Sequence, residues 1–209
     1  MKPAEPLPRF ELRRLAWADE ELGSIDLPAG PMRLRTSFAS GLTVRPGDTP
    51  GILWAVGDRG PNLKVGTLVR LYGLESMRPF LALERAKVMP RLDIGPSIAK
   101  LRVGDDRVEL VSAHRLVDED GSPVVGLPIP GGEHARREPA LDLAGGPLDP
   151  HPAGFDTEGL CAAGAAGFWI GDEFGPSLVR VDPEGRIVER VIPQGLSIEG
   201  AHYPVRPIL

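Results

Sequence analysis

The sequence predicts an all-β fold made of short antiparallel strands. Three observations support this. First, Gly and Pro are abundant, with 26 and 23 of the 209 residues, and they are spread along the whole chain, which suits tight turns between short strands better than long helices. Second, Gly or Pro interrupts nearly every window that is long enough for a helix. Third, short apolar or alternating runs recur between turn signals, as strands of an antiparallel sheet do.

Five such runs stand out in chain order. They lie at 51–56 (GILWAV), 67–72 (TLVRLY), 107–111 (RVELV), 167–170 (GFWI) and 177–181 (SLVRV). The last run gives the clearest hairpin, because the turn 182–185 (DPEG) follows it and the alternating run 186–191 returns. Pro presets the backbone of such a turn, and Gly accepts its left-handed position.

The segment 123–152 is different. It is rich in Gly, Pro and charged residues and has no sustained period. We interpret it as a long irregular loop or insertion with at most one short strand. Loops of this length in compact domains either carry function or vary freely.

Composition excludes several classes of protein. The 24 basic residues are dispersed and the net charge is −5, so we expect no nucleic-acid partner. The chain has a single cysteine, Cys161, which excludes an internal disulfide and a Cys-rich zinc site. No apolar stretch approaches the roughly 20 residues of a membrane helix, and no apolar leader is present. We therefore expect no membrane partner and a cytoplasmic location by default, or a periplasmic or secreted one if a leader has been lost.

An internal repeat links two parts of the chain. Residues 54–61 (WAVGDRGP) and 169–176 (WIGDEFGP) both read W-x-x-x-[D/E]-x-G-P, and a Gly-Leu step precedes each, at 41–42 and 159–160. The pattern predicts a strand that starts at Gly-Leu, followed by a turn and a second, apolar strand that contains the Trp. After this second strand the chain continues through an acidic residue and a Gly-Pro turn. We expect Trp54 and Trp169 to occupy equivalent positions in two sheets.

The repeat motifs resemble the phytase-like family, also described as esterase-like activity of phytase. The resemblance covers about 41–207. It rests on 156–160 (DTEGL), 168–178 (FWIGDEFGPSL), 182–186 (DPEGR), 57–62 (GDRGPN), 120–123 (DGSP) and 126–130 (GLPIP).

The resemblance implies a β-propeller of four-stranded antiparallel blades and a hydrolytic activity of the esterase or phosphatase type. Residues 1–209 would then form the N-terminal part of a single phytase-like propeller domain. Because family members continue into further strands where this chain stops, we expect an incomplete, truncated propeller.

Five acidic residues of the motifs are candidate ligands of a divalent metal, most readily Ca²⁺: Asp58, Asp156, Glu158, Asp172 and Glu173. Carboxylates that leave strands at converging loops supply the hard oxygen atoms that such ions bind. The alternative is that they accept hydrogen bonds from turn amides. Within this set, Glu158 and Glu173 are also candidate catalytic residues. Arg59 is a third, which either pairs with a substrate phosphate or carboxylate or locks Asp58 or a neighbouring loop.

Other hydrolase signatures are missing. No G-x-S-x-G elbow occurs, and the four histidines show no paired metal-binding spacing. Of these, His151 and His202 lie in loops beside the acidic motifs and remain minor candidates. The leading hypothesis is a metal-assisted hydrolase of a small phosphate or carboxylic ester. The alternatives are a non-catalytic propeller that binds a ligand or partner, and a lactonase-like propeller.

Overall fold

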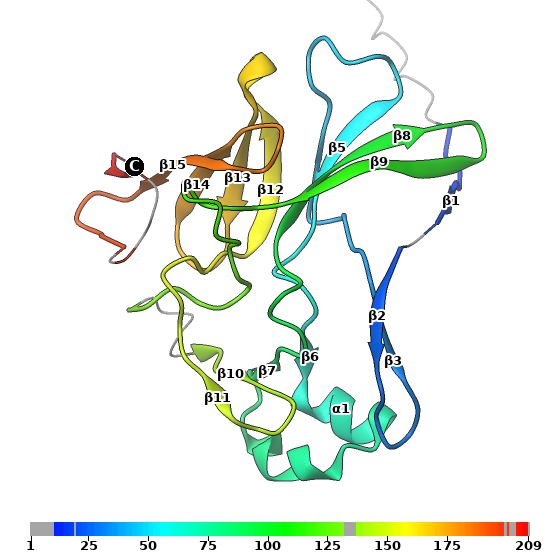
Figure 1. Cartoon of the computed structure of the whole chain (residues 1–209), viewed down its shortest axis with the longest axis vertical. Coiled ribbons are helices and arrows are strands. Elements are labelled where there is room, and N and C mark those ends of the chain that lie inside the picture. The colour runs from blue at the N-terminus through cyan, green and yellow to red at the C-terminus, as the bar shows by residue number, and fades with distance from the viewer. Residues whose placement is uncertain (1–10, 19, 132–136, 199, 201–203, 209) are drawn as a thin grey trace, which may run out of the picture.

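The computed structural model describes residues 11–18, 20–131, 137–198, 200 and 204–208. Within these ranges the chain is mostly β-structure arranged as two large sheets, a small sheet and a two-stranded ribbon (Figure 1). No helix in the described ranges is both long and apolar enough to cross a membrane.

The first large sheet has the order β1-β9-β8-β5-β4. Its four antiparallel strands follow one another in space, and a fifth strand, β1, lies parallel to β9 on the outer edge. The strands are β4 (Gly41–Thr43), β5 (Ile52–Val56), β8 (Ser97–Val103), β9 (Arg107–Arg115) and β1 (Ala16–Trp17).

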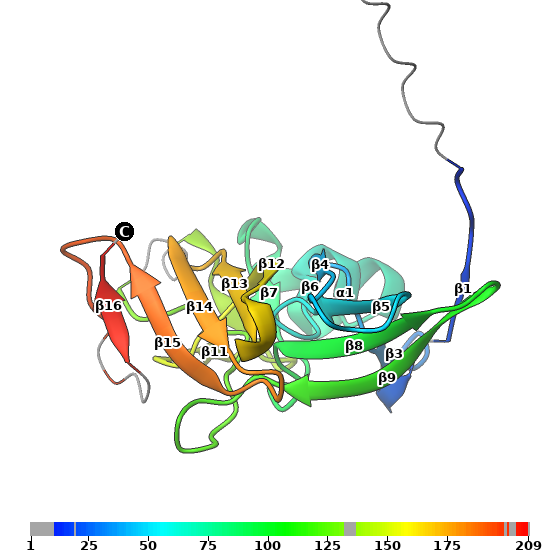
Figure 2. The same cartoon turned by 90° about the horizontal axis from the view of Figure 1, so that it is seen from above.

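The second large sheet repeats this arrangement. Four antiparallel strands run in the order β12-β13-β14-β15, and β16 lies parallel to β15 on the outer edge, as Figure 2 shows. The strands are β12 (Thr157–Ala162), β13 (Phe168–Asp172), β14 (Ser177–Val181), β15 (Ile187–Ile192) and β16 (Val205–Pro207). The expected antiparallel four-stranded sheets are therefore present, each with one added strand.

The two tryptophans of the repeat occupy the same register. Trp54 lies opposite Thr43, two residues after Gly41 of β4, and Trp169 lies opposite Cys161, two residues after Gly159 of β12. Both Trp residues are thus on the second strand of their sheet, at the same position relative to the glycine of the first strand. The repeat seen in the sequence corresponds to a repeat in the structure.

A shared apolar core joins the large sheets. The rings of Trp54 and Phe168 lie 4.7 Å apart between centroids at an angle of 44°, and they pack with Val56, Ile98 and Ile170. Neighbouring residues of a strand point to opposite faces, so Trp169 points away from the face that carries Phe168. The face of the first sheet that carries Trp54 therefore packs on the face of the second sheet that carries Phe168, and not on the face that carries Trp169.

A lobe of mixed structure, which we call the α1 lobe, is built mainly from the chain between β5 and β8 and from part of the segment 123–152 (Figure 1). It contains the small sheet of β6 (Leu63–Lys64), β7 (Lys87–Val88), β10 (Ala140–Leu141) and β11 (Pro147–Leu148), with α1 (Val65–Tyr72) and the 3₁₀ helix η1 (Glu75–Ala82). The ribbon of β2 (Glu21–Ile25) and β3 (Met32–Arg35) runs beside it, and a short 3₁₀ turn, η2 (Gly164–Ala166), joins β12 to β13.

Helix α1 corrects the expectation of a strand at 67–72. Val65, Leu68 and Val69 are buried in the core of the α1 lobe, and their i, i+3, i+4 spacing puts them on one side of a helix. Gly73 ends the helix in the left-handed conformation, with φ of 65°.

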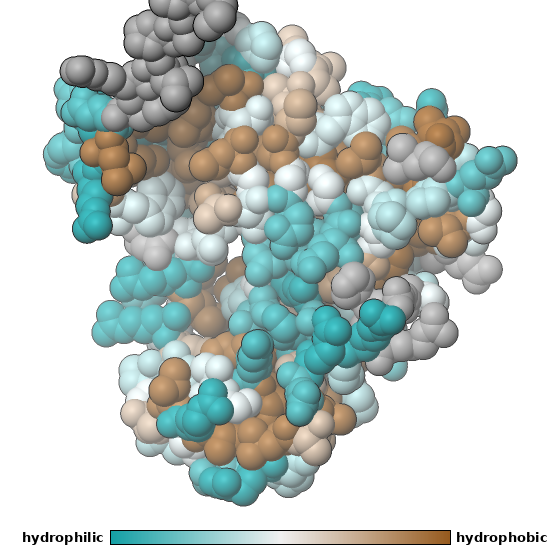
Figure 3. Space-filling view, turned by 180° about the vertical axis from the view of Figure 1, so that it is seen from behind, coloured by the Kyte–Doolittle hydropathy of each residue, from teal (hydrophilic) through white to brown (hydrophobic). Residues whose placement is uncertain are grey.

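Figure 3 shows hydrophilic residues on the surface of the narrower region between the large sheets and the α1 lobe.

The segment 123–152 is largely irregular where it is described, but it contributes the two short strands β10 and β11 rather than one. The hairpin at 177–191 forms as expected. The Gly185 amide donates to the Asp182 carbonyl at 3.1 Å, and Gly185 has φ of 88°.

Candidate metal centre

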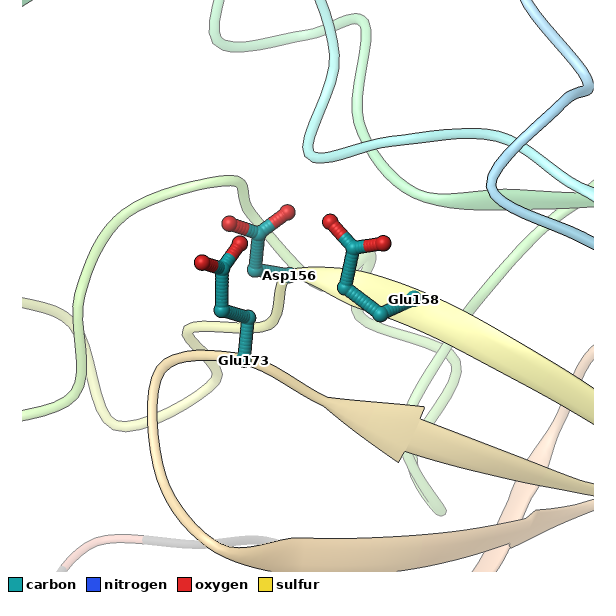
Figure 4. Close-up of side chains that lie close together, drawn as sticks. All are labelled: Asp156, Glu158 and Glu173. Atoms are coloured by element: carbon teal, nitrogen blue, oxygen red, sulfur yellow. The ribbon is translucent and has the colours of Figure 1, made fainter.

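Three carboxylates converge at one end of the second large sheet (Figure 4). Asp156 precedes β12, Glu158 lies in β12, and Glu173 directly follows β13. One oxygen atom from each lies within 4.8 Å of the other two. We call these three residues the acidic group. Asp156 is fully buried, whereas the other two are exposed, so the group has a buried floor and an open rim.

Strand pairing explains this convergence. Thr157 lies opposite Asp172 and Gly159 lies opposite Gly171, so Glu158 is the extra residue of a β-bulge. Bulges redirect side chains and are frequent beside functional sites. The Glu173 amide also donates to the Asp156 carbonyl at 2.9 Å, which fixes the start of β12 against the turn after β13.

The first large sheet adds Asp58 and Arg59, which follow β5. The hydroxyl of buried Thr157 donates to the carbonyl of Gly57 and so holds this segment against β12. Arg59 is buried and forms ion pairs with Asp156 and Glu138. Its guanidinium also lies 4.6 Å from the Phe174 ring centre, so Arg59 has little freedom to reach a substrate and instead locks neighbouring segments together.

Negative charge exceeds positive charge here. Nη2 of Arg59 lies 3.9 Å from a Glu173 oxygen, and Nε lies 3.7 Å from Asp58 Oδ1. A single guanidinium therefore serves the carboxylates of Asp58, Glu138, Asp156 and Glu173. The Asp156 carboxylate forms an ion pair with Arg59. Even so, neither of its oxygen atoms receives a hydrogen bond of good geometry from the described residues. A buried carboxylate left in this state is costly unless a proton or a cation joins it.

The pKa values follow from this crowding. Burial is the main cause that raises the pKa of Asp156 to about 8, and contact with the Asp58 carboxyl group adds to it, while Arg59 acts the opposite way. Burial also raises the pKa of Glu158, followed by the negative charges of Glu173 and Asp58. For Asp58, burial acts to raise the pKa, but contact with Asp156 and the Arg59 amide lowers it on balance. Carboxyl groups in contact cannot all be ionised without a compensating cation.

Asp172 does not join the acidic group. Its side chain forms a fully buried ion pair with Arg190, and the Ser177 hydroxyl donates to it at 3.1 Å. Its Oδ1 accepts hydrogen bonds from the amides of Asp156, at 3.0 Å, and Phe174, at 3.1 Å. We infer that Asp172 positions the loops on which Asp156 and Glu173 lie.

Two residues of the surroundings were not predicted. Glu138 lies in the segment that we interpreted as a loop or insertion, 79 positions from Arg59, and no local signal marks it. Arg190 does carry a signal, because it occupies an inward position among the apolar residues of β15 and a buried charge needs a partner.

Of the two histidine candidates, His151 does not belong to the acidic group. His151 is exposed, and its Nδ1 accepts a hydrogen bond of 3.1 Å from the Ala153 amide. The other loop candidate, His202, lies outside the described residues.

Two hollows adjoin the acidic group. One is a pocket of 490 Å³ with Glu173 on its wall, lined otherwise mainly by apolar side chains and glycines. The other is a more open hollow of 450 Å³ that contains both Glu158 and Glu173. Glu173, Pro176 and Ser177 line both. A third pocket of 450 Å³, on the side of the first large sheet, has Asp58 on its wall.

Comparison with known proteins gives one family and one distant relative. The family model described as esterase-like activity of phytase matches residues 36–204. An uncharacterized secreted protein of Arthroderma benhamiae is 28% identical over 157 residues, which are 70% of this chain and 29% of that protein. The chain thus spans less than a third of that relative. No solved structure matches it.

Proposed function

Since the chain belongs to the phytase-like family, we propose that it is a metal-assisted hydrolase of carboxylic or phosphoric esters, with Ca²⁺ as the metal. The observation that carries this proposal is the acidic group itself. It joins a fully buried carboxylate, which receives no hydrogen bond of good geometry from the described residues, to two exposed carboxylates at 4.8 Å or less.

The residues present fit a hard divalent cation. Asp156, Glu158 and Glu173 would hold it, with Asp58 beside them, and all four supply the oxygen ligands that Ca²⁺ prefers. When bound, such an ion polarises the carbonyl or phosphoryl oxygen of an ester and stabilises the charge that develops on it. Arg59 offsets part of the negative charge and keeps Asp156 in place.

The side chains supply proton transfer. We assign Glu158 as the general base, because it is exposed on the bulge and lines the open hollow beside the acidic group. Water attacks the ester carbon or phosphorus and gives a proton to the Glu158 carboxylate. The bond to the leaving alkoxide breaks, and that oxygen receives the proton from Glu158.

A propeller scaffold is part of the same proposal. Two observations support it. The two large sheets repeat one strand order and one register. The Trp54 face of the first sheet packs on the Phe168 face of the second, which is not the face that carries the equivalent Trp169. This stacking is the relation between neighbouring propeller blades. The acidic group would then lie where blades converge.

The test is hydrolysis by chelator-treated protein with and without added CaCl₂, using p-nitrophenyl acetate and p-nitrophenyl phosphate. We expect Ca²⁺-dependent turnover that Glu158→Gln reduces by about 100-fold or more. Glu109→Gln, at an exposed position of β9, is the control and should retain activity. A turnover rate that is the same with and without CaCl₂, and that Glu158→Gln leaves unchanged, would contradict the proposal. Metal binding without any turnover would favour a non-catalytic binding module. Faster hydrolysis of a sugar lactone than of either ester would favour the lactonase-like alternative.

A further inference from the structure

We propose that the 490 Å³ pocket beside Glu173 binds the apolar acyl chain of a carboxylic ester, which makes such esters the preferred substrate class. This inference rests on the proposed hydrolase function. The volume falls within the range of small-molecule sites. The wall is built largely from apolar side chains: Ile129, Phe174, Pro176, Ile192, Leu196 and Ile198.

Part of the pocket wall is fixed by the core, and the rim of the pocket is exposed to solvent. Phe174 is 1% exposed and Ile192 is 3% exposed, so these two side chains are fixed by the core. Leu196 is 52% exposed, whereas leucine is among the residue types that are most often buried in folded proteins. An apolar chain in the pocket would remove part of Leu196 and of the wall from water, which is favourable in proportion to the area buried.

Charge selects against a phosphate-rich ligand. Among the described residues, no Lys, Arg or His lines this pocket or the open hollow beside it. The guanidinium groups of Arg59, beside Glu173, and of Arg190, which donates to Ser177 at 2.9 Å, are buried and already paired with carboxylates. Recognition of several phosphates needs Arg or Lys side chains free to form charge-assisted hydrogen bonds, and Glu173 on the wall would repel such a ligand.

Position connects the pocket to the chemistry. Glu173 belongs both to the acidic group and to the pocket wall, and the open hollow that also contains Glu158 shares Pro176 and Ser177 with the pocket. An ester group placed at Glu158 and Glu173 therefore has its acyl chain next to the pocket. Water adds its oxygen to the carbonyl carbon, the bond from that carbon to the alcohol oxygen breaks, and the products are a carboxylic acid and an alcohol.

The experiment compares p-nitrophenyl acetate, butyrate and octanoate with the Ca²⁺-loaded full chain. We expect kcat/KM to rise by about tenfold or more from acetate to octanoate. Leu196→Gln should lower kcat/KM for octanoate by about three- to tenfold and leave acetate unchanged. Ser197→Trp, on the same rim, should block the pocket and reduce only the long-chain rates.

A binding measurement separates this inference from the function on which it rests. Octan-1-ol, an uncharged chain of the same length, is titrated calorimetrically into metal-free protein and should bind to the wild type and more weakly to Leu196→Gln. If no ester is hydrolysed but octan-1-ol binds in this manner, the hydrolase proposal fails and the pocket stands. If acetate and octanoate are hydrolysed equally well, and octan-1-ol does not bind, the pocket assignment is wrong while the hydrolase proposal stands.

Discussion

The guanidinium of Arg59 pairs with the carboxylate of Asp156 at the junction of the two large sheets, and both side chains are almost completely buried. Arg59 follows the second strand of one sheet, and Asp156 precedes the first strand of the other. The ion pair therefore joins the sheets at the floor of the acidic group. It leaves Asp156 with one cationic neighbour and no hydrogen-bond donor of good geometry in the described part of the chain.

The repeated Gly-Leu steps should respond differently to the same substitution. A Cβ on Gly41 would lie 2.7 Å from the Leu160 backbone nitrogen, whereas a Cβ on Gly159 would meet nothing within 4 Å. We expect Gly41→Ala to lower the free energy of unfolding by about 1–3 kcal/mol, and Gly159→Ala to change it by less than about 0.5 kcal/mol. Urea denaturation of both variants measures this. Equal losses would show that β4 and β12 do not approach as described.

The buried ion pair of Arg190 with Asp172 should be critical for stability. Arg190→Met leaves the Asp172 carboxylate buried without its cation, which should cost about 3–5 kcal/mol of unfolding free energy. Arg180→Met is the matched control on the neighbouring strand, because Arg180 is 29% exposed and its pair with Glu189 should contribute about 1 kcal/mol or less. Comparable losses in the two variants, measured by urea denaturation, would mean that Asp172 is not the positioning residue inferred here.

A pH dependence is expected from Asp48, in the loop between β4 and β5. Hydrogen bonds from Arg45 and Trp54 lower the pKa of Asp48 below its ordinary 3.8. A lowered pKa stabilises the folded state above pH 3.8, and this contribution is lost as the pH falls through the folded-state pKa. Asp48→Asn should therefore reduce stability at pH 7 by about 1 kcal/mol and have progressively less effect below pH 3.8.

Thermal unfolding of the wild type and Asp48→Asn between pH 2.5 and 7 tests this dependence. Asp105→Asn, on the exposed turn between β8 and β9, is the control and should follow the wild type throughout. A difference between Asp48→Asn and the wild type that stays constant over the whole pH range would contradict the assignment.

Local signals predicted the second large sheet well. The turn at 182–185 and the alternation around it define β14 and β15, and the repeat of Trp54 and Trp169 identified equivalent strands. Helix α1 escaped prediction because its run of β-branched and aliphatic residues also suits a strand. Its helical pattern of Val65, Leu68 and Val69 decides the matter only when the core of the α1 lobe buries that side.

The acidic motifs predicted which residues lie near one another but not their individual surroundings. Asp172 and Glu173 are adjacent in sequence, yet neighbouring residues at a strand end point to opposite sides. One therefore pairs with Arg190 and the other reaches the acidic group. Glu138 could not be predicted, because only the folded chain brings it to Arg59.

The most direct test of the metal centre is a calorimetric Ca²⁺ titration of the chelator-treated protein. We predict one site in the wild type, and loss of at least about tenfold in affinity in both Glu158→Gln and Glu173→Gln, because each removes a charged ligand. Glu109→Gln, whose side chain is about as exposed as Glu173, should bind as the wild type does. Absence of binding in the wild type, or binding of equal strength in all four proteins, would contradict the metal centre.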